Sequence, residues 1–262
     1  MLLGLLLHLS FAVNAWAAFA PGVSSRSEWR HWAQAPFVFS GEAMLELSTV
    51  PAMMRRRLSA LGRMAVAAAD SVMLDVDGTQ HTHMPIVWAS RYGDAKRALE
   101  LLADQAQSQP LSPTAFGLSV HNGIGAQHSI ARSIMDNAVC VASGVHTAEA
   151  GMVEALALLH DGAPEVLLVC YDAPLPGSYA TFHDEPVAEY AWAVRVSLES
   201  LSPGAMRFSL SNAGGSEEVV ALHTDGCALP HGLTVLQYML SGREVLESRC
   251  AGQFWQWRRS HG

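Results

Sequence analysis

The sequence feature that most constrains the fold is the short, continuously apolar run VLLVC at residues 166–170. This run is far shorter than the roughly 18 to 20 residues that a membrane-spanning helix needs. Unbroken apolarity over so few residues is typical of a strand at the centre of a sheet covered on both faces. Similar runs occur at 86–90 (IVWAS) and 138–143 (AVCVAS), and a helical pattern follows each. The chain is therefore predicted to be an α/β protein.

Other patterns extend this interpretation along the chain. Apolar residues recur at three- and four-residue spacing over 50–73, which predicts one long amphipathic helix with Pro51 in its first turn. In the helix predicted at 93–107, Ala98, Leu101 and Leu102 are expected to face inward. The remaining predicted elements are a strand within 9–23, a helix at 24–34 capped by Ser24 or Ser25, two alternating strands at 189–200 and 206–214, and a helix with an aromatic, basic tail at 232–262.

The composition excludes several classes of protein. The net charge is −8 and no Lys/Arg-rich run carries interleaved aromatic residues, so nucleic-acid binding is disfavoured. The four cysteines are widely separated and form no metal-type spacing, which favours reduced thiols in the cytoplasm. The apolar N-terminus imitates a secretory leader but lacks its Lys/Arg region. We expect a cytoplasmic protein with no membrane span, no metal and no cofactor.

Several segments, taken in order, carry a resemblance to a known family. They are PAMMRRRLSALGRMA, IVWASRYGDAKRALELL, LSPTAFGLSVHNGIGAQHSIAR and GVHTAEAGMVEALALLHDGAPEVLLVCYDAPLP. From about residue 11 to 200 the chain resembles the β-ketoacyl synthase N-terminal family, and more narrowly its short chain length factors from aryl polyene type II polyketide systems. The resemblance implies a thiolase-like fold consisting of a single N-terminal half of a ketosynthase, a βαβαβαββ mixed sheet with helices on both faces.

This resemblance also divides the chain. It implies an N-terminal extension at 1–10, the synthase-like domain at 11–211 and a C-terminal segment at 212–262 whose packing is left open. It further implies that the sheet and central helix expose an apolar face which a second half would cover, and such a face usually marks a partner interface.

In a ketosynthase of this family, the nucleophilic cysteine lies where a short strand turns into a buried helix. There the helix N-terminus lowers the pKa of the thiol and neighbouring amides form the oxyanion hole. Matched residue by residue, this position falls on Val145, which has no nucleophile. Cys140 lies inside the strand, and Ser143 has no identifiable base, so neither is a favoured substitute. The catalytic histidines of the family come from the second half of a full-length synthase, so we expect no catalysis by this chain.

The resemblance assigns other residues to binding. His121 and Asn122 border the acyl pocket in this interpretation, although a helix cap and a surface turn would explain them equally well. The arginine cluster is either a solvated helix face or a docking site for an acidic carrier protein. The acyl-pocket candidates are Phe116, His121, Asn122, Ser143, Gly144, Val145 and His146; the partner-interface candidates are Asn137, Ala138, Val139, Cys140 and Val141; the carrier-docking candidates are Arg55, Arg56 and Arg57.

The leading functional hypothesis is a non-catalytic chain length factor. It would form a heterodimer with a full-length β-ketoacyl synthase, meet the acyl carrier protein through that complex, and limit the length of the acyl chain. One alternative is a stand-alone module that binds acyl groups or acyl carrier protein without a ketosynthase partner. Another is an independent hydrolase or transferase that uses Ser143 or Cys140.

Overall fold

The computed structural model describes residues 7–45, 47, 50–74, 81, 83–214, 227–250 and 252–260. Its strands form one eight-stranded sheet in the order β3-β2-β4-β5-β1-β6-β8-β7. β2 is parallel to β3 and β4, and the other neighbouring pairs are antiparallel. The strands are β1 (Leu7–Phe19), β2 (Ile86–Ala89), β3 (Ala138–Val141), β4 (Val166–Asp172), β5 (Tyr190–Ser197), β6 (Met206–Gly214), β7 (Val245–Cys250) and β8 (Gln253–Ser260). The predicted mixed α/β sheet is confirmed.

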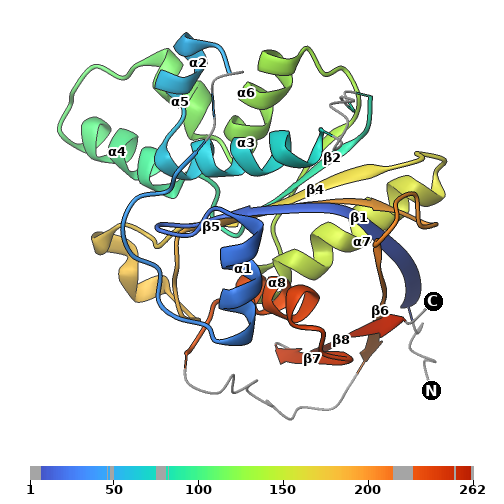
Figure 1. Cartoon of the computed structure of the whole chain (residues 1–262). Coiled ribbons are helices and arrows are strands. Elements are labelled where there is room, and N and C mark those ends of the chain that lie inside the picture. The colour runs from blue at the N-terminus through green and yellow to red at the C-terminus, as the bar shows by residue number, and fades with distance from the viewer. Residues whose placement is uncertain are drawn as a thin grey trace.

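The sheet curls around β1, which is the longest strand (Figure 1). β1 pairs with β5 through Ala12–Phe19 and with β6 through Leu7–Val13, and its pairing with β5 shifts register between Val13 and Ala15. Such a bulge bends a strand and increases its twist. Beyond this bend, β6, β8 and β7 turn back beneath the rest of the sheet (Figure 1).

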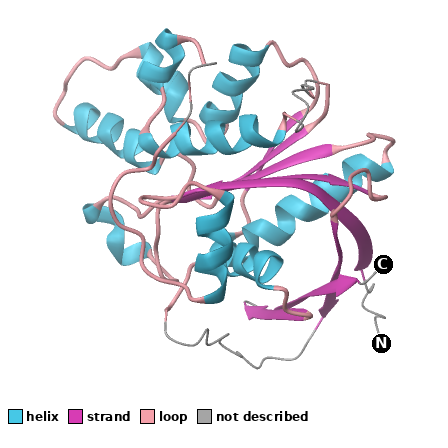
Figure 2. Ribbon diagram, in the orientation of Figure 1, coloured by secondary structure: helices cyan, strands magenta, loops and turns pink. Residues whose placement is uncertain are grey.

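One face of the flatter part of the sheet is covered by a group of helices (Figures 1 and 2). The most buried of them is α3 (Ala60–Val72), which packs against β5, β1 and β4. Its alanines, such as Ala65, Ala68 and Ala69, have small side chains that allow close approach. These helices are α2 (Ala52–Arg57), α3 (Ala60–Val72), α4 (Ala95–Ala106), α5 (Pro113–Ser119) and α6 (Gly123–Arg132).

The second group, α1 (Arg26–Gln34), α7 (Thr147–His160) and α8 (His231–Ser241), lies inside the curl of the sheet (Figure 2). Gly151 lets α7 approach closely, because a Cβ at this position would lie 2.8 Å from Ala89 Cβ. α1 begins at a capping box in which Ser25 Oγ accepts from Glu28 N and the Glu28 carboxylate accepts from Ser25 N. The predicted cap at Ser24 or Ser25 is therefore confirmed, at Ser25.

Two expectations about the elements are wrong. The single helix predicted at 50–73 is two helices, because Ser59 Oγ accepts from Gly62 N and starts α3 as a new N-cap. Ala98, Leu101 and Leu102 do not face the core: none of the residues of α4, all of which the structure describes, is buried. The helix predicted within 232–262 is α8, and the aromatic tail after it, for which no element was predicted, is the hairpin β7–β8, in which Trp257 is fully buried.

The expected apolar face left by a missing half is also absent from the described residues around α7. Nearly all of α8 is buried, and it packs on α7 from inside the curl, together with Phe208 and Trp257 of β6 and β8. β6 runs across the predicted boundary at 211/212, and β1 begins before residue 11. Residues 1–6 and 215–226 lie outside the described residues. The division into 11–211 and 212–262 stays a prediction, and β6 runs across the boundary between the two parts.

Candidate functional site

The predicted nucleophile position lies in a tight connection between β3 and α7, residues 143–146, which we call the elbow. It contains the short 3-10 helix η1 (Gly144–His146), and Gly144 has the left-handed φ of 54° that favours glycine. Ser143 N donates to Thr147 Oγ1 (3.0 Å), and the same hydroxyl donates to Gly144 O (2.7 Å). The threonine therefore fixes the turn at the start of the helix, as a nucleophile-bearing turn requires.

The side chains of the elbow supply no thiol. Val145 is half-buried, and Ser143 and Gly144 are exposed. Cys140 lies in β3, where burial raises the pKa of its thiol to about 11. A thiolate is the reactive form of cysteine, so burial suppresses the nucleophilicity of Cys140. The assignment of the nucleophile position to Val145 stays a prediction, and Cys140 is a poor substitute for it.

Directly behind the elbow lies a buried polar cluster that the sequence analysis missed. The Glu149 carboxylate is fully buried in α7, and its Oε1 lies 2.7 Å from His231 Nε2 and accepts from Trp257 Nε1 at 3.0 Å. His146 Nε2 lies 2.9 Å from Ser248 Oγ, and its ring is 5.4 Å from the His231 ring. The cluster joins the first turns of α7 and α8 to the hairpin β7–β8.

The pKa values follow from this geometry. Burial alone would raise the pKa of Glu149, but the charge of His231 and the bonds from His231 and Trp257 outweigh it and lower that pKa. Burial alone would lower the pKa of His231, but Glu149 raises it. Burial lowers the pKa of His146. The arrangement is therefore a buried Glu149–His231 ion pair beside a neutral His146.

His231 bears on the expected loss of the catalytic histidines. A histidine does lie beside the elbow, at the start of α8, so the expectation that this chain lacks the family's catalytic histidines stays a prediction. Two signals pointed to the cluster: Glu149 is a carboxylate among small and apolar helix residues, and Pro230 directly precedes His231 and Gly232 at a helix start.

The acyl-pocket candidates occupy three places rather than one. Phe116, 64% exposed, lines a groove of about 540 Å³ between α4 and α5. His121 Nε2 lies 2.8 Å from Ser90 O and joins two loops, and Asn122 is exposed at the start of α6. Ser143, Gly144, Val145 and His146 form the elbow, with His146 buried behind it. The groove is also lined by Ala98, Leu101, Leu102, Gln105, Leu111, Ser112, Pro113 and Ser119.

The partner-interface candidates lie on the edge strand β3, which pairs only with β2 in the described part of the sheet. Asn137 O accepts from Ile86 N, and Val141 O accepts from Ser90 N. Since alternate residues of a strand bond to opposite sides, the backbone groups of Ala138 and Cys140 point away from β2. Ala138 is exposed, and Val139, Cys140 and Val141 are half-buried.

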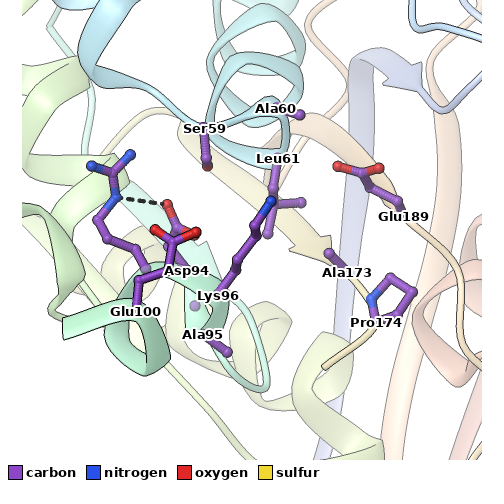
Figure 3. A pocket seen from close by; sticks show the side chains of 12 residues that line it. Ser59, Ala60, Leu61, Asp94, Ala95, Lys96, Glu100, Ala173, Pro174 and Glu189 are labelled. Carbon is purple, nitrogen blue, oxygen red and sulfur yellow. Dashed lines mark hydrogen bonds and ion pairs between the residues drawn. The ribbon is translucent and has the colours of Figure 1, made fainter. Parts of the chain in front are cut away.

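The carrier-docking candidates Arg55, Arg56 and Arg57 form the last turn of α2. Arg56 and Arg57 are exposed, and Arg57 O accepts from Arg97 Nη2 at 2.8 Å. Beside them is a cavity of about 450 Å³ between the starts of α3 and α4 and the end of β4 (Figure 3). Lys96, the sole lysine of the sequence, extends into this cavity between Glu100 of its own helix and Glu189 before β5 (Figure 3).

Comparison with known proteins decides the family. The model of the beta-ketoacyl synthase N-terminal domain matches residues 29–258. The chain belongs to this family. The match continues past residue 211, so this β-ketoacyl synthase-family chain carries the family pattern into α8 and the hairpin β7–β8. No curated protein matches the chain.

Solved structures confirm the thiolase-like ketosynthase fold. The β-ketoacyl synthase-family chain is 28% identical to a chain in the structure of the ketosynthase ApeO in complex with its chain length factor ApeC from Xenorhabdus doucetiae, with a TM-score of 0.78 over 96% of this chain and 100% of that one. The ishigamide ketosynthase/chain length factor shares 14% identity and a TM-score of 0.62 over 78% of this chain and 67% of that one. A β-ketoacyl synthase from Burkholderia phymatum shares 10% identity and a TM-score of 0.54 over 72% of this chain and 59% of that one.

These likenesses relate the chain to complexes of ketosynthases with chain length factors.

Among the described residues, no helix combines the length and apolarity that a membrane span requires.

Proposed function

We propose that this chain is a chain length factor: a non-catalytic subunit that pairs with a full-length β-ketoacyl synthase in the cytoplasm and limits acyl chain length in aryl-polyene-type biosynthesis. The observation that carries the proposal is the 28% identity, over nearly the whole of both chains, to a chain in a complex of a ketosynthase with its chain length factor. The valine at the predicted nucleophile position and the raised pKa of the Cys140 thiol support a non-catalytic role.

The partner would pair with the edge strand β3 through Asn137, Ala138, Val139, Cys140 and Val141. An unpaired edge offers a row of backbone donors and acceptors to another chain. Two exposed apolar side chains near β3 support this docking surface: Ile130 of α6 is 68% exposed, and Met135, between α6 and β3, is 94% exposed. Large apolar side chains at such exposure are unfavourable in water and become buried when a partner covers them.

The acyl chain would end at the groove between α4 and α5. Apart from three polar side chains, the groove is lined by alanine, leucine, proline and phenylalanine, which suits a hydrocarbon chain. Phe116 lies there exposed, and a bulkier lining would leave less length for the chain. The elbow residues Ser143, Gly144 and Val145 would line the approach from the side of β3.

An acyl carrier protein would approach the arginines of α2 through the complex. Arg56 and Arg57 are exposed, and Arg63 Nε donates to Arg55 O, so arginine side chains gather here on a protein whose net charge is −8. A local positive patch on a negative protein steers an acidic partner toward one place.

The test is co-expression with a full-length ketosynthase encoded beside this gene, followed by capture of this chain and size-exclusion chromatography. We expect a stable one-to-one complex whose condensation activity survives Cys140→Ala in this chain and is lost when the ketosynthase loses its own cysteine. A monodisperse monomer that ignores the ketosynthase, or activity that depends on Cys140, would overturn the proposal.

One other candidate function has its own supporting observation. The groove of about 540 Å³ lies within this chain alone, so a stand-alone module could bind acyl groups without a ketosynthase. Titration of the purified chain with a fatty acid of medium length discriminates the two functions: tight binding by a monomer favours the stand-alone module, and binding that requires the ketosynthase favours the chain length factor.

A further inference from the structure

The connection between β4 and β5, residues 173–189, is far longer than antiparallel neighbours need. Two such strands can be joined by about two to five residues. This segment, which we call the strap, instead extends outward through the short helix η2 (Gly177–Phe182), the gold coil at the left of Figure 1. Its large apolar residues Tyr179, Phe182 and Val187 are 37%, 65% and 47% exposed. Apolar packing therefore contributes little to holding the strap in place.

Polar contacts hold the strap at its base. The Arg91 guanidinium, whose side chain is only 8% exposed, forms ion pairs with Asp184 and Glu185 of the strap. The second carboxylate oxygen of Glu185 accepts from His231 N at 2.8 Å. Leu175 N donates to His183 Nε2 at 2.9 Å within the strap. Arg91 thus joins the strap to the loop after β2, and Glu185 joins it to the start of α8.

A third carboxylate, that of Asp172, lines the same cavity as Asp184 and Glu185 and contacts the backbone of Arg91. Asp172 Oδ1, at the end of β4, accepts from Ser90 Oγ and from Arg91 N, both at 3.0 Å. Burial raises the pKa of Asp172 to about 7, even though the bonds from Ser90, Arg91 and Tyr92 favour its ionised form. The charged and titratable groups around Asp172 are Arg91, Tyr92 and Asp94 from the loop after β2, Cys170 and Tyr171 from β4, Tyr190 from β5, Asp184 and Glu185 from the strap, His231 from α8 and Glu149 from α7.

We propose that Arg91 and Asp172 form a pH-sensitive latch, which holds the strap closed when Asp172 is neutral and loosens it when Asp172 is ionised. This device goes beyond the proposed function and does not depend on it. Asp172, Asp184 and Glu185 line the same small cavity, and the Arg91 guanidinium pairs with the two strap carboxylates only. An ionised Asp172 therefore repels the strap carboxylates without a guanidinium of its own, and a neutral Asp172 does not repel them.

Opening of the strap and ionisation of Asp172 favour each other. When the strap moves away, water reaches Asp172 and stabilises its charged form, which its buried position disfavours. The closed strap leaves a cavity of only about 20 Å³ beside Arg91 and Asp172, close to the volume that one water needs. Because Glu185 contacts His231 beside the elbow, the latch also links the strap to the cluster behind the elbow.

Hydrogen exchange of the intact chain, followed by mass spectrometry at pH 6 and pH 8, tests the latch. Protection factors of peptides spanning 173–189 remove the intrinsic pH dependence of exchange. A carboxyl whose pKa is about 7 closed and about 3.8 open makes opening about tenfold more favourable at pH 8 than at pH 6. We expect strap protection to fall by about this factor, while the amides of β4 keep theirs.

Asp172→Asn should make strap protection equal at the two pH values, because asparagine does not titrate. The matched control is Glu189→Gln, which removes a carboxyl at the end of the strap that faces Lys96 rather than Arg91, and which should keep the pH dependence. Equal protection at pH 6 and pH 8 in the unaltered chain, the same tenfold change in Asp172→Asn, or parallel loss in β4 would overturn the proposal.

If Asp172→Asn does not fold, Asp184→Asn replaces it. Asp184 is 61% exposed, so its loss should leave the core intact and lower strap protection already at pH 6. Unchanged strap protection in Asp184→Asn would overturn the latch.

Discussion

At the scale of single residues, Glu149 connects parts of the chain that are distant in sequence. No pattern in its own helix indicates these contacts. Its carboxylate contacts His231, which is 82 residues away in sequence, and Trp257, which is 108 residues away. A buried charge is tolerated only when its partners replace the lost water. These partners hold α7, α8 and β8 in one arrangement directly behind the elbow.

The Glu149–His231 pair predicts a specific dependence of stability on pH. The pKa of Glu149 is lowered from 4.5, so its contribution is complete above 4.5 and is lost as the pH falls through its folded value. The pKa of His231 is raised from 6.5, so its contribution is complete below 6.5 and is lost as the pH rises through its folded value. The pair therefore stabilises the fold most between pH 4.5 and 6.5.

We expect His231→Gln to lower the free energy of unfolding by about 3 kcal/mol at pH 5.5, because it leaves the Glu149 charge buried with one partner fewer. The loss should shrink well above pH 6.5, where the unaltered chain also loses the charge of His231. Urea unfolding at pH 5.5, 7 and 9 measures this. His160→Gln, at the exposed end of α7, is the control and should change little at any pH. A loss that stays constant across the range would refute the ion pair.

At the scale of elements, β3 differs from its neighbours in how little of it this chain covers. β2 and β4 are fully buried, whereas β3 is exposed at Ala138 and half-buried beyond it. All three read alike in sequence, because each is a short apolar run. The difference arises from position in the sheet, since β3 alone of these three described strands lies at an edge.

Cys140→Pro should weaken pairing with a partner strand while the chain still folds. The Cys140 N–H points away from β2, so Cys140→Pro removes an outward donor and keeps the ladder with β2. We expect affinity for the ketosynthase to fall more than about tenfold with a small change in melting temperature. Binding measured by calorimetry checks this, with Cys140→Ala as the neutral control. Undiminished affinity of a folded Cys140→Pro chain would exclude β3 as the docking strand.

Element prediction from the sequence succeeded where one periodicity continued and failed where a side chain or tertiary position intervened. The apolar runs identified β2, β3 and β4. The helix predicted at 50–73 is interrupted because the Ser59 hydroxyl caps a new helix. α4 has the expected apolar stripe, but the sequence does not indicate that the stripe lines a surface groove with Phe116 rather than the core.

At the scale of the whole molecule, the curled sheet brings β6, α8, β7 and β8 into one core with the first half. α8 is almost completely buried, and Phe208, Trp257 and Leu233 pack in the same cluster as Met152 and Leu156 of α7. The helices inside the curl are therefore enclosed by strands from both ends of the chain.

Truncation tests this enclosure directly. A chain cut after Ser211 would expose α7 and the inner face of β1, so we expect it to aggregate or to lack a cooperative unfolding transition. Far-UV circular dichroism during thermal unfolding measures the outcome. Removal of residues 261–262 is the control and should preserve the transition. Cooperative unfolding of the chain cut after Ser211 would instead support the predicted domain 11–211.

Much of the candidate site is a product of this enclosure, which limits what the sequence could predict. The family resemblance located the elbow, because strand, turn and helix follow one another in the chain. It could not find His231, Ser248 or Trp257, because their contacts with His146 and Glu149 depend on how the sheet bends at β1. The resemblance also led to the expectation that the family's catalytic histidines are missing from this chain.

The side chain of Lys96 has a practical consequence for finding partners. As the sole lysine, it is the one side-chain amine that a succinimide ester or a lysine-directed cross-linker can modify, and it lies at the cavity at the starts of α3 and α4. A bound carrier protein would shield that side chain or become covalently joined to it. Amine chemistry, which usually modifies many side chains of a surface, would here mark one known side chain besides the α-amine of the N-terminus.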